Sequence, residues 1–431
     1  MTHAQGVRVT GAVAGLLVLA TGAAAQVPIA AGETAPGPSV RLGGQMRQQF
    51  ERFANEEWGA EPPDHDGYWL QRYMWRLDAR IWRRVRLYGE LKSGIEIGRA
   101  GGPRPPDEDQ LDLHQAFVEV SRGSVAWRIG RQELAFGSQR LVSAREGPNV
   151  RQTFDAASII VTRHGWRLDA FGGRYVGTAP GVFDDASDTG RSLWGLYAVR
   201  YDDRRQRGVD LYYLGYRRAA ATFDQGSGRE LRHSVGARAW GSRGALDYNV
   251  EGVVQAGRFA RADIRAWTLA SDVGYRLDTS PGWVRVGMRT DVTSGDRDRD
   301  DDRLGTFNPL FPKGAYFGLI ASAGPSNHSD LHPQVSITLR RTVIVTASWL
   351  MFWRRQVDDG IYDLAGNVLR SGEGTRSRFV GHSPGIEAEW QVTRRLSLTG
   401  DASLFTAGPF IRESGPGRTT RFVAAWATYR F

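Results

Sequence analysis

Hydrophobic and polar residues alternate with a period of two along most of the chain after Val40. In residues 284–292, for example, Val284 and Val286 fall on one face, while Arg285 and Arg289 fall on the other. Residues 247–254 and 396–404 repeat this pattern. Because successive side chains of an extended strand point to opposite sides, the chain is predicted to form strands with one apolar and one polar face.

Short connections join these strands in pairs. Eight of them can be placed, at residues 79–81, 121–124, 163–165, 202–208, 241–244, 277–282, 340–342 and 393–395. Eight turns join sixteen strands. Unpaired alternating segments at residues 40–53 and 421–431 raise the predicted number to eighteen.

The remaining connections are long and polar, and they alternate strictly with the short ones. They lie at residues 54–66, 98–110, 133–155, 177–190, 219–229, 258–263, 294–330, 354–378 and 407–419. A soluble sandwich or propeller also consists of alternating strands, but it has no reason to gather its long loops at one end. The pattern predicts an all-β fold, a transmembrane antiparallel β-barrel of the outer-membrane type with short periplasmic turns and long extracellular loops.

Aromatic residues favour the same fold. Several lie on the apolar face of their strands, where a barrel carries its interfacial girdles, namely Trp75, Trp127, Trp267, Trp349, Trp390 and Tyr429. The last segment, residues 422–431, alternates and ends on Phe431. This ending resembles the signal by which barrels are recognised for insertion into the outer membrane.

The composition excludes several classes of protein. A mean hydropathy of −0.40 excludes a helical membrane protein. The chain of 431 residues has no cysteine, which excludes a disulfide framework, a thiolate metal site and a cysteine nucleophile. The formal net charge is +9, and only Lys92 and Lys313 of the 56 basic residues are lysine. A GC-rich genome is one explanation for the arginine excess, but arginine stays charged in either case and favours anionic partners.

The amino terminus is predicted to be a secretory signal peptide. A polar and basic start, an apolar stretch at residues 11–20 and three alanines before Gln26 indicate residues 1–25. The apolar stretch is too short to favour the alternative of a retained membrane anchor. Residues 26–39 then form a periplasmic lead-in, and residues 40–431 form the barrel in the outer membrane of a Gram-negative bacterium.

If the polar face of every strand points inward, the lumen is densely charged with both signs. The residues expected there are Arg72, Arg76, Asp78, Arg80, Arg86, Glu90, Lys92, Glu119, Arg128, Arg167, Asp169, Arg200, Arg238, Asp247, Glu251, Arg276, Arg285, Arg289, Asp291, Glu387 and Glu389. Rings of arginine in a pore select anions. The alternative is that these arginines pair with carboxylates across the wall and only help to fill the interior.

Patterns that resemble enzyme motifs are better explained without catalysis. Residues 381–385 (GHSPG) match a nucleophile elbow, but a strand pattern follows and no histidine comes later. His328 and His332 are expected as a surface pair in a loop, not as zinc ligands. The acidic run at residues 296–302 is expected to be a solvated loop, with calcium binding as the alternative. We therefore expect no catalytic residues, no metal, no cofactor and no nucleic-acid partner.

Three stretches carry a resemblance to a known family. They are residues 111–120 (LDLHQAFVEV), residues 130–142 (GRQELAFGSQRLV) with their continuation to residue 155, and residues 305–314 (GTFNPLFPKG). The chain resembles the alginate export porin family from about residue 40 to residue 431. This resemblance implies an eighteen-stranded barrel and passage of an anionic polysaccharide, alginate in the name-giving members, through an arginine-rich constriction.

The matching motif positions imply pore or pore-loop roles for five residues, namely Arg131, Arg140, Asn149, Arg151 and Asp155. Residues 133–155 would then fold partly inward and narrow the lumen. The alternative is that Gly130 and Arg131 end a strand and that the loop only braces the barrel. The strand pattern adds further candidates for the substrate path, namely Arg76, Arg128, Arg285 and Arg289. Between the two sets, we expect the motif-bearing loop to govern selectivity, because its charges would meet the substrate in the narrowest part of the lumen.

These observations together predict a passive outer-membrane channel for anionic solutes, with an alginate-type polysaccharide as the first candidate. The alternative is a general or small-molecule porin, and a plugged membrane enzyme or a surface adhesin is less favoured. Expected partners are the anionic solute, outer-membrane lipid and periplasmic export components.

Overall fold

The computed structural model describes residues 37–63, 66–202, 204–280, 282–314, 318, 320 and 323–431. The predicted signal peptide and residues 26–36 of the predicted lead-in lie outside these residues. None of the helices in the described part of the chain is long and apolar enough to cross a membrane.

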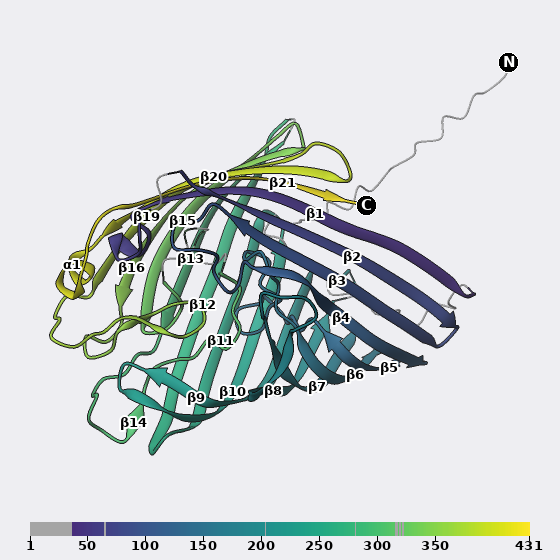
Figure 1. Ribbon diagram of the computed structural model, residues 1–431, viewed down its shortest axis with the longest axis horizontal. Helices are drawn as coiled ribbons and strands as arrows, with labels where there is room; N and C mark the ends of the chain where they lie inside the picture. The colour runs from purple at the N-terminus through teal and green to yellow at the C-terminus, as the bar shows by residue number, and fades with distance from the viewer. Residues whose placement is uncertain are drawn as a thin grey trace.

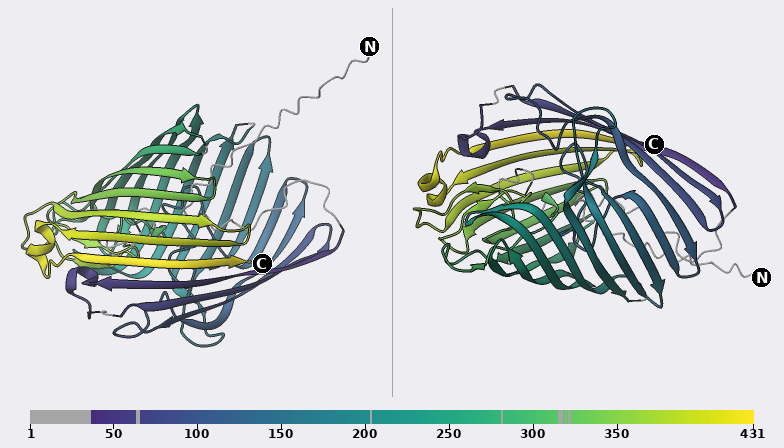
Figure 2. Two further views of the ribbon diagram at one scale, coloured as in Figure 1. Left: turned by 90° about the horizontal axis from the view of Figure 1, so that it is seen from above. Right: turned by 60° about the horizontal axis from the view of Figure 1, so that its bottom comes forward.

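Eighteen strands form one closed antiparallel barrel (Figures 1 and 2). Each strand pairs with the next along the chain, and β1 also pairs with β21, which closes the sheet. The strands are β1 (Ser39–Ala54), β2 (Tyr68–Trp82), β3 (Val85–Ile97), β4 (Asp109–Arg122), β5 (Val125–Gln132), β6 (Phe154–Arg163), β7 (Trp166–Gly177), β8 (Ala186–Tyr201), β9 (Arg207–Phe223), β10 (Gly226–Arg243), β11 (Leu246–Phe259), β12 (Ala262–Asp278), β13 (Trp283–Thr293), β15 (His328–Leu339), β16 (Val343–Arg354), β19 (Phe379–Gln391), β20 (Leu396–Ala407) and β21 (Thr420–Arg430).

Small elements lie in the loops at the left-hand end of Figure 1. They are η1 (Glu56–Gly59), β14 (Arg303–Leu304), β17 (Ile361–Tyr362), β18 (Val368–Arg370) and α1 (Pro409–Ser414). An apolar cluster that includes Trp58, Tyr68, Phe352, Phe405 and Phe410 packs η1 and α1 against the strand ends. This cluster fixes η1 and α1 to the wall at that end of the barrel.

The predicted fold class and strand number are confirmed, but the first short turn was placed wrongly. It lies at residues 83–84 and not at residues 79–81, because β2 continues to Trp82. The register shifts between Arg80 and Trp82, and Ile81 and Trp82 are both exposed on the outer surface. A β-bulge of this kind interrupts the alternation that the sequence-based placement relied on.

Two of the predicted long loops are wrong as well. At residues 219–229 and 258–263 the strands continue into two-residue hairpins, between β9 and β10 and between β11 and β12. Phe223 and Phe259 at the ends of these strands are buried, and their rings lie 5.0 Å apart. Burial of this aromatic pair stabilises the ends of these four strands, so they continue through the residues predicted to be loops. The predicted strict alternation of short turns and long loops therefore fails at these two connections.

The alternation places apolar side chains outside and polar ones inside, as predicted. Outward-facing Leu42, Ile129 and Val254 are 80%, 65% and 60% exposed, and the girdle residue Trp75 is also exposed. Inward-facing polar side chains include many that are buried within the barrel. Arg200 is an exception to the predicted list, because it lies on the exposed row of β8 with Leu196 and so faces outward.

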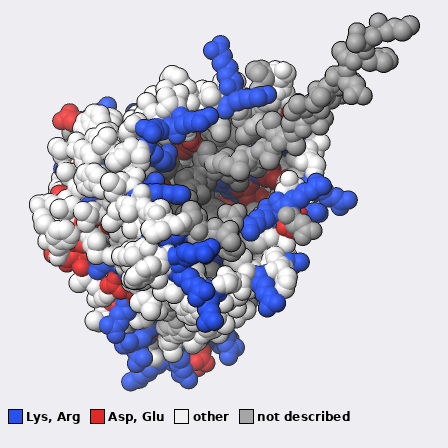
Figure 3. Space-filling view, turned by 90° about the vertical axis from the view of Figure 1, so that its right-hand side faces the viewer, with Lys and Arg blue, Asp and Glu red and all other residues white. Residues whose placement is uncertain are grey.

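The short turns at the other end of the barrel are rich in arginine. Exposed arginines occupy or directly precede seven of the eight turns, namely Arg83, Arg84, Arg122, Arg163, Arg204, Arg205, Arg243, Arg340, Arg341, Arg394 and Arg395. The turn between β12 and β13 is the one without such a residue. Basic side chains therefore surround this opening of the barrel (Figure 3).

Adjacent residues near the middle of β16 test the two faces of the wall. Ala347 is exposed on the outer face, and Ser348 is half-buried on the inner face. Ala347→Arg should lower the free energy of unfolding by about 2–4 kcal/mol, because a guanidinium would enter the lipid near the midplane. Ser348→Arg should change it little. Urea unfolding of the refolded, heat-modifiable barrel measures both values, and equal destabilisation would contradict the assigned faces.

Candidate functional site

The barrel wall loses a strand partner where β5 ends at Gln132, because residues 133–153 leave the wall and enter the lumen. We call these residues the inward loop. The Phe136 ring stacks on Phe171 and Tyr197 of the wall, with ring centroids 4.7 and 5.0 Å apart. Further along, the Ser138 hydroxyl donates to Glu251 on β11 at 2.5 Å. The loop thus crosses the interior and narrows it, as predicted from the family resemblance.

Residues 304–313, in the segment between β13 and β15, join the inward loop inside the barrel. The Ser143 N–H donates to the Phe311 carbonyl, and the Phe311 N–H donates to the Leu141 carbonyl, both at 2.9 Å. Leu141 and Phe311 share an apolar cluster with Phe154 of the wall. Backbone bonds and apolar contacts therefore hold the two segments together as one partition.

Two arginines of the wall hold the far side of the inward loop. Arg72 pairs with the Glu146 carboxylate at 2.6 Å and donates to the Asn149 carbonyl at 2.8 Å. Arg47 donates to the carbonyls of Glu146 and Gly147, both at 3.1 Å. Both side chains are buried. Their positive charges are thus used to anchor the loop to β1 and β2.

Asn149 is itself a structural tie. Its side-chain amide donates to the carbonyls of Gln71 at 2.9 Å and Asp107 at 3.0 Å, and its backbone N–H donates to the Asp107 carboxylate at 2.6 Å. The residue is 1% exposed. The structure places this predicted pore-loop residue against β2 and the loop that follows β3. Its lumen role stays a prediction.

The other arginines of the inward loop are paired. Arg140 contacts Asp291 on β13. Arg151 pairs with Glu133 at 2.8 Å and with Glu146 at 3.1 Å. Burial alone would raise the pKa of Glu146, but Arg151 and the two anchoring arginines outweigh it and hold this pKa well below its usual range. Glu146 therefore stays ionised between its cationic partners.

Glu133 has the opposite balance. Burial raises the pKa of its carboxyl to about 7, although Arg151 acts to lower it. The carboxylate also lies 2.7 Å from Nε2 of His114 on β4. Arg151 therefore links two carboxylates with different proton affinities.

Arg131 and Asp155 lie in the wall and not in the inward loop. They are paired across β5 and β6, with Nε of Arg131 3.0 Å from the Asp155 carboxylate. Along these strands they share the outward-facing row of Ile129 and Ile159. The assignment of Arg131 to the loop is therefore wrong, and the pair braces the wall where β5 ends.

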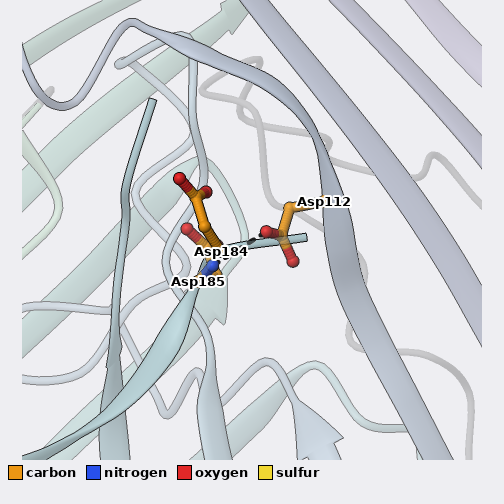
Figure 4. A group of neighbouring side chains, drawn as sticks. All are labelled: Asp112, Asp184 and Asp185. Atoms are coloured by element: carbon orange, nitrogen blue, oxygen red, sulfur yellow. Dashed lines mark hydrogen bonds between the residues drawn. The ribbon is translucent and has the colours of Figure 1, made fainter. Parts of the chain in front are cut away.

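Three carboxylates form a cluster near the point where β5 ends, namely Asp112, Asp184 and Asp185 (Figure 4). Two cations partly offset its charge, and both are shared with other carboxylates, Lys92 with Asp109 and Arg131 with Asp155. Lys92 pairs with Asp185 at 2.6 Å, and Arg131 lies 3.6 Å from Asp112. Asp112 also accepts the backbone N–H of Asp185 at 2.9 Å. The cluster is thus an ion-paired brace between β4 and the loop that precedes β8.

Three of the four wall candidates are ion-paired. Arg128 pairs with Glu119 at 2.5 Å, Arg285 with Asp247 and Asp272, and Arg289 with Asp272 at 2.8 Å. In the part of the chain that the structure describes, Arg76 is exposed and lies within 4.0 Å of no carboxylate. The alternative of pairing across the wall thus describes Arg128, Arg285 and Arg289, while Arg76 lies opposite Glu90 in the register without a direct ion pair.

Two cations of the inward segments were not singled out by the sequence analysis. Lys313 donates its backbone N–H to Gln139 at 2.9 Å and lies within electrostatic reach of Arg289, Glu146 and Glu387. Arg145 has a φ of 54° on the inward loop and, among the described residues, no carboxylate within 4.0 Å. Lys313 lies within the quoted PLFPKG motif, so its position was visible in sequence, but its approach to β13 and β19 was not.

Among the described residues, the inward-facing side chains of β16, β19 and β20 are less buried than those of β6 to β9. Inward-facing residues in the halves of these strands nearest the short turns are half-buried, including Thr346, Ser348, Glu387, Glu389 and Thr399. Inward-facing residues of β6 to β9 are instead buried under the partition, as are Phe154 and Tyr197. The less buried inward-facing residues thus form a polar and partly acidic stretch of the wall.

The histidine pair, the GHSPG segment and the acidic run, which resemble enzyme or metal-binding motifs in sequence, lie in strands or loops of the barrel. His328 and His332 lie in β15 and are buried, so the prediction of a surface pair in a loop is wrong. Residues 381–385 lie in β19, which no helix follows. In the acidic run, Asp298 and Asp300 are exposed as predicted. Asp296 is buried and accepts the Gly305 N–H at 2.7 Å.

The sequence of the chain matches the alginate export family over residues 39–425. The chain belongs to this family. No curated protein matches it. As an alginate export family member with an outer-membrane barrel fold, it is an outer-membrane channel.

Solved structures of Pseudomonas aeruginosa porins share the fold. OpdK with vanillate superposes with a TM-score of 0.63 at 10% identity, and the match covers 91% of this chain and 98% of that one. OccK2 (OpdF) in complex with glucuronate gives a TM-score of 0.59 at 11% identity, with the same coverage. OccK11 (OpdR) gives 0.56 at 11% identity, covering 91% and 96%. At these identities the likeness shows the fold alone.

Release of the inward loop tests the anchoring arginines. Arg72→Ala should destabilise the docked loop by on the order of 3 kcal/mol, because the carbonyls and carboxylate of a buried turn lose a cation. The chain has no cysteine, so Gly147→Cys adds a single thiol at an exposed loop position with open space around it. Arg72→Ala should speed maleimide labelling at position 147, while Arg80→Ala on the same strand should not. Unchanged labelling would contradict the anchoring role.

Titration of Lys313 gives a second test. Burial, together with Arg289, lowers the pKa of Lys313 to about 8. The ammonium loses its charge as the pH rises through this value, so the preference of the channel for anions should fall between about pH 7 and pH 9. Reversal potentials in a salt gradient measure this preference. Lys313→Arg keeps the charge and should flatten the profile, whereas an unchanged slope would assign the titration to another group.

Proposed function

We propose that this outer-membrane channel passes anionic solutes by passive diffusion, and that an alginate-type anionic polysaccharide is its substrate. The observation that carries the proposal is the charge at the edge of the partition. Arg145 and Lys313 bring positive charge into the narrowed lumen, and Arg289 lies within electrostatic reach of Lys313. Cations in a narrow, poorly hydrated passage attract anions more strongly than the same cations on a wide wall.

The ion pairs narrow the set of residues expected to act on the substrate. Arg128 and Arg285 are neutralised by wall carboxylates, and Arg140 and Arg151 by carboxylates around the inward loop. A substrate carboxylate would have to displace these partners. Cations without a neighbouring carboxylate offer the stronger attraction, so Arg76 and Arg145 are the better candidates for the path.

The solved neighbours support the class of substrate. The OccK2 structure is a complex with glucuronate, which is a sugar acid, and the OpdK structure contains vanillate. Alginate is a chain of sugar acids with one carboxylate on each unit. A barrel of this fold can therefore bind a single sugar acid, which is the unit of such a polymer. Membership of the alginate export family supports the polymer as the substrate.

A small-molecule porin is the second candidate function. The partition contacts β1, β2, β8, β11 and β13, so it is fixed on several sides of the lumen. A passage narrowed in this way favours single sugar acids over a folded or bulky chain. Neither function requires turnover, and we expect the channel to have no catalytic activity. Cleavage of residues 1–25 as a signal peptide remains a prediction, and so does binding of periplasmic export components.

Current block by sugar-acid oligomers tests the function. Oligouronates should block the single-channel current in planar bilayers at concentrations where neutral oligosaccharides of equal length do not. Arg145→Gln should weaken this block about ten-fold, because a hydrogen bond to a charged group contributes about 1.5–3 kcal/mol. Arg378→Gln, in the exposed loop before β19, should leave the block unchanged.

The length dependence of the block separates the two functions. Block that strengthens from monomer to longer oligomers supports polymer passage, because more carboxylates engage the path. Block by monomers alone supports the small-molecule porin. Equal block by charged and neutral oligomers contradicts both anionic readings and leaves a general porin.

A further inference from the structure

The short-turn end of the barrel carries an arc of arginines that the lumen does not explain. The turn between β2 and β3 contains Arg83 and Arg84, and the turn between β19 and β20 contains Arg394 and Arg395. We call these four residues the rim arc. β20, β21, β1 and β2 are consecutive in the sheet. Strands about 4.8 Å apart separate the two turns by about 15 Å across the sheet. Arg430 lies opposite Gln45 and Arg80 lies opposite Ser39, so the turns are also offset along the strands, and the total distance is about 30 Å.

The rim arc is exposed and unbalanced. All four side chains are exposed, and in the described ranges none of them lies within 4.0 Å of a carboxylate oxygen. The view onto this end shows basic side chains around a hollow, with acidic side chains visible within it (Figure 3). A cluster of like charges around an opening produces a positive field that extends into the solution in front of it.

The opposite end of the barrel also has exposed arginines, but acidic side chains lie among them. Arg99 and Arg104 there pair with Glu56, and Arg299 pairs with Asp224. The loops at that end also contain the acidic run at residues 296–302. The positive field is therefore directed along the barrel axis, with its strong side at the short turns.

The positive row continues from the rim arc into the lumen. Arg76 and Arg80 face inward on β2 about 13 Å apart, and Asp78 between them is paired with Arg86. Arg430 faces inward on β21, and its backbone N–H donates to the Arg395 carbonyl at 2.8 Å. Anionic headgroups of the surrounding lipid would use the outer side of the turns alone. Continuity with inward-facing arginines favours a ligand that enters the barrel.

We propose that the rim arc captures an anionic polymer chain from the periplasm and feeds it to the inward-facing arginines, so that the channel is loaded from its short-turn end. The assignment of the captured polymer as a polyuronate rests on the proposed function. Repeated carboxylates about one sugar apart would engage several guanidiniums of the arc at once, and each guanidinium can bind a carboxylate through two hydrogen bonds. Because the capture is electrostatic, it acts on the association rate and is screened by salt.

The experiment uses the full mature chain inserted in one direction into planar bilayers of zwitterionic lipid, with a defined oligouronate added to one side at a time. Block from the short-turn side should show the faster association rate at low salt. The combined variant R83Q/R84Q/R394Q/R395Q should slow that rate about ten-fold or more. Dwell time, conductance and block from the other side should not change. In 1 M salt, where the screening length is about 3 Å, the difference should disappear.

A matched variant controls for net charge. R297Q/R303Q/R355Q/R378Q removes the same number of exposed arginines at the opposite end, and it should leave the association rate from the short-turn side unchanged. An equal loss in both variants would overturn capture at the rim. Equal association rates from the two sides of the unsubstituted channel would overturn it as well.

Two further arms separate the proposal from its alternatives. If the rim variant blocks normally but inserts poorly into bilayers that contain anionic phospholipid, the arc binds headgroups and the proposal is wrong. Binding of a labelled oligouronate to the detergent-solubilised barrel is measured by fluorescence anisotropy. Salt-sensitive binding that the rim variant loses supports capture even where no current block occurs, and only the proposed passage then fails.

Discussion

Closure of the sheet by the pairing of β1 with β21 is the constraint on which the rest of this structure depends. Lipid offers no hydrogen bonds to backbone groups, so a sheet in a membrane must have no free edge. The ten residue pairs from Gln45 with Arg430 to Ala54 with Arg421 meet this requirement. A closed barrel of eighteen strands has a wide interior. The chain fills part of this interior with its own loops.

Filling a polar interior with loops requires that buried charges be balanced. The turn at Glu146 meets this condition by accepting from Arg47 and Arg72 of the wall while it pairs with Arg151 of its own loop. The same rule governs Arg140 with Asp291 on the other side. Four arginines are thereby used to hold the partition in place.

The sequence predicts the parts of the fold that depend on local periodicity. Alternation identified the wall, its faces and the eighteen strands, since each strand repeats the same two-residue rule. It misplaced the first turn, because the bulge before Trp82 breaks the rule without changing the composition. It misread residues 219–229 as a loop, because their glycines suggest a turn while Phe223 is buried against residues far along the chain.

The candidate site was predictable only in outline. The motif-bearing segment was correctly expected to fold inward, but spacing could not show that Arg131 precedes the point where the chain leaves the wall. Nor could it show that Asn149 and Arg151 hold the loop in place. Arg145 and Lys313 were hidden for the same reason, because their importance comes from partners on other strands and not from their own neighbours in sequence.

The short β5 has a consequence for how such a channel can open. Where β5 ends, the upper part of β4 pairs instead with the loop before β8, through Leu111 with Val182 and the hydrogen bond from Phe183 to Leu111 at 2.9 Å. Lys92 and Arg131 reinforce this contact with the acidic cluster. The wall therefore has a lateral seam sealed by side chains at the root of the inward loop. Withdrawal of the whole loop would strain that seam and would also break the contacts of Arg47 and Arg72 with the far side of the loop.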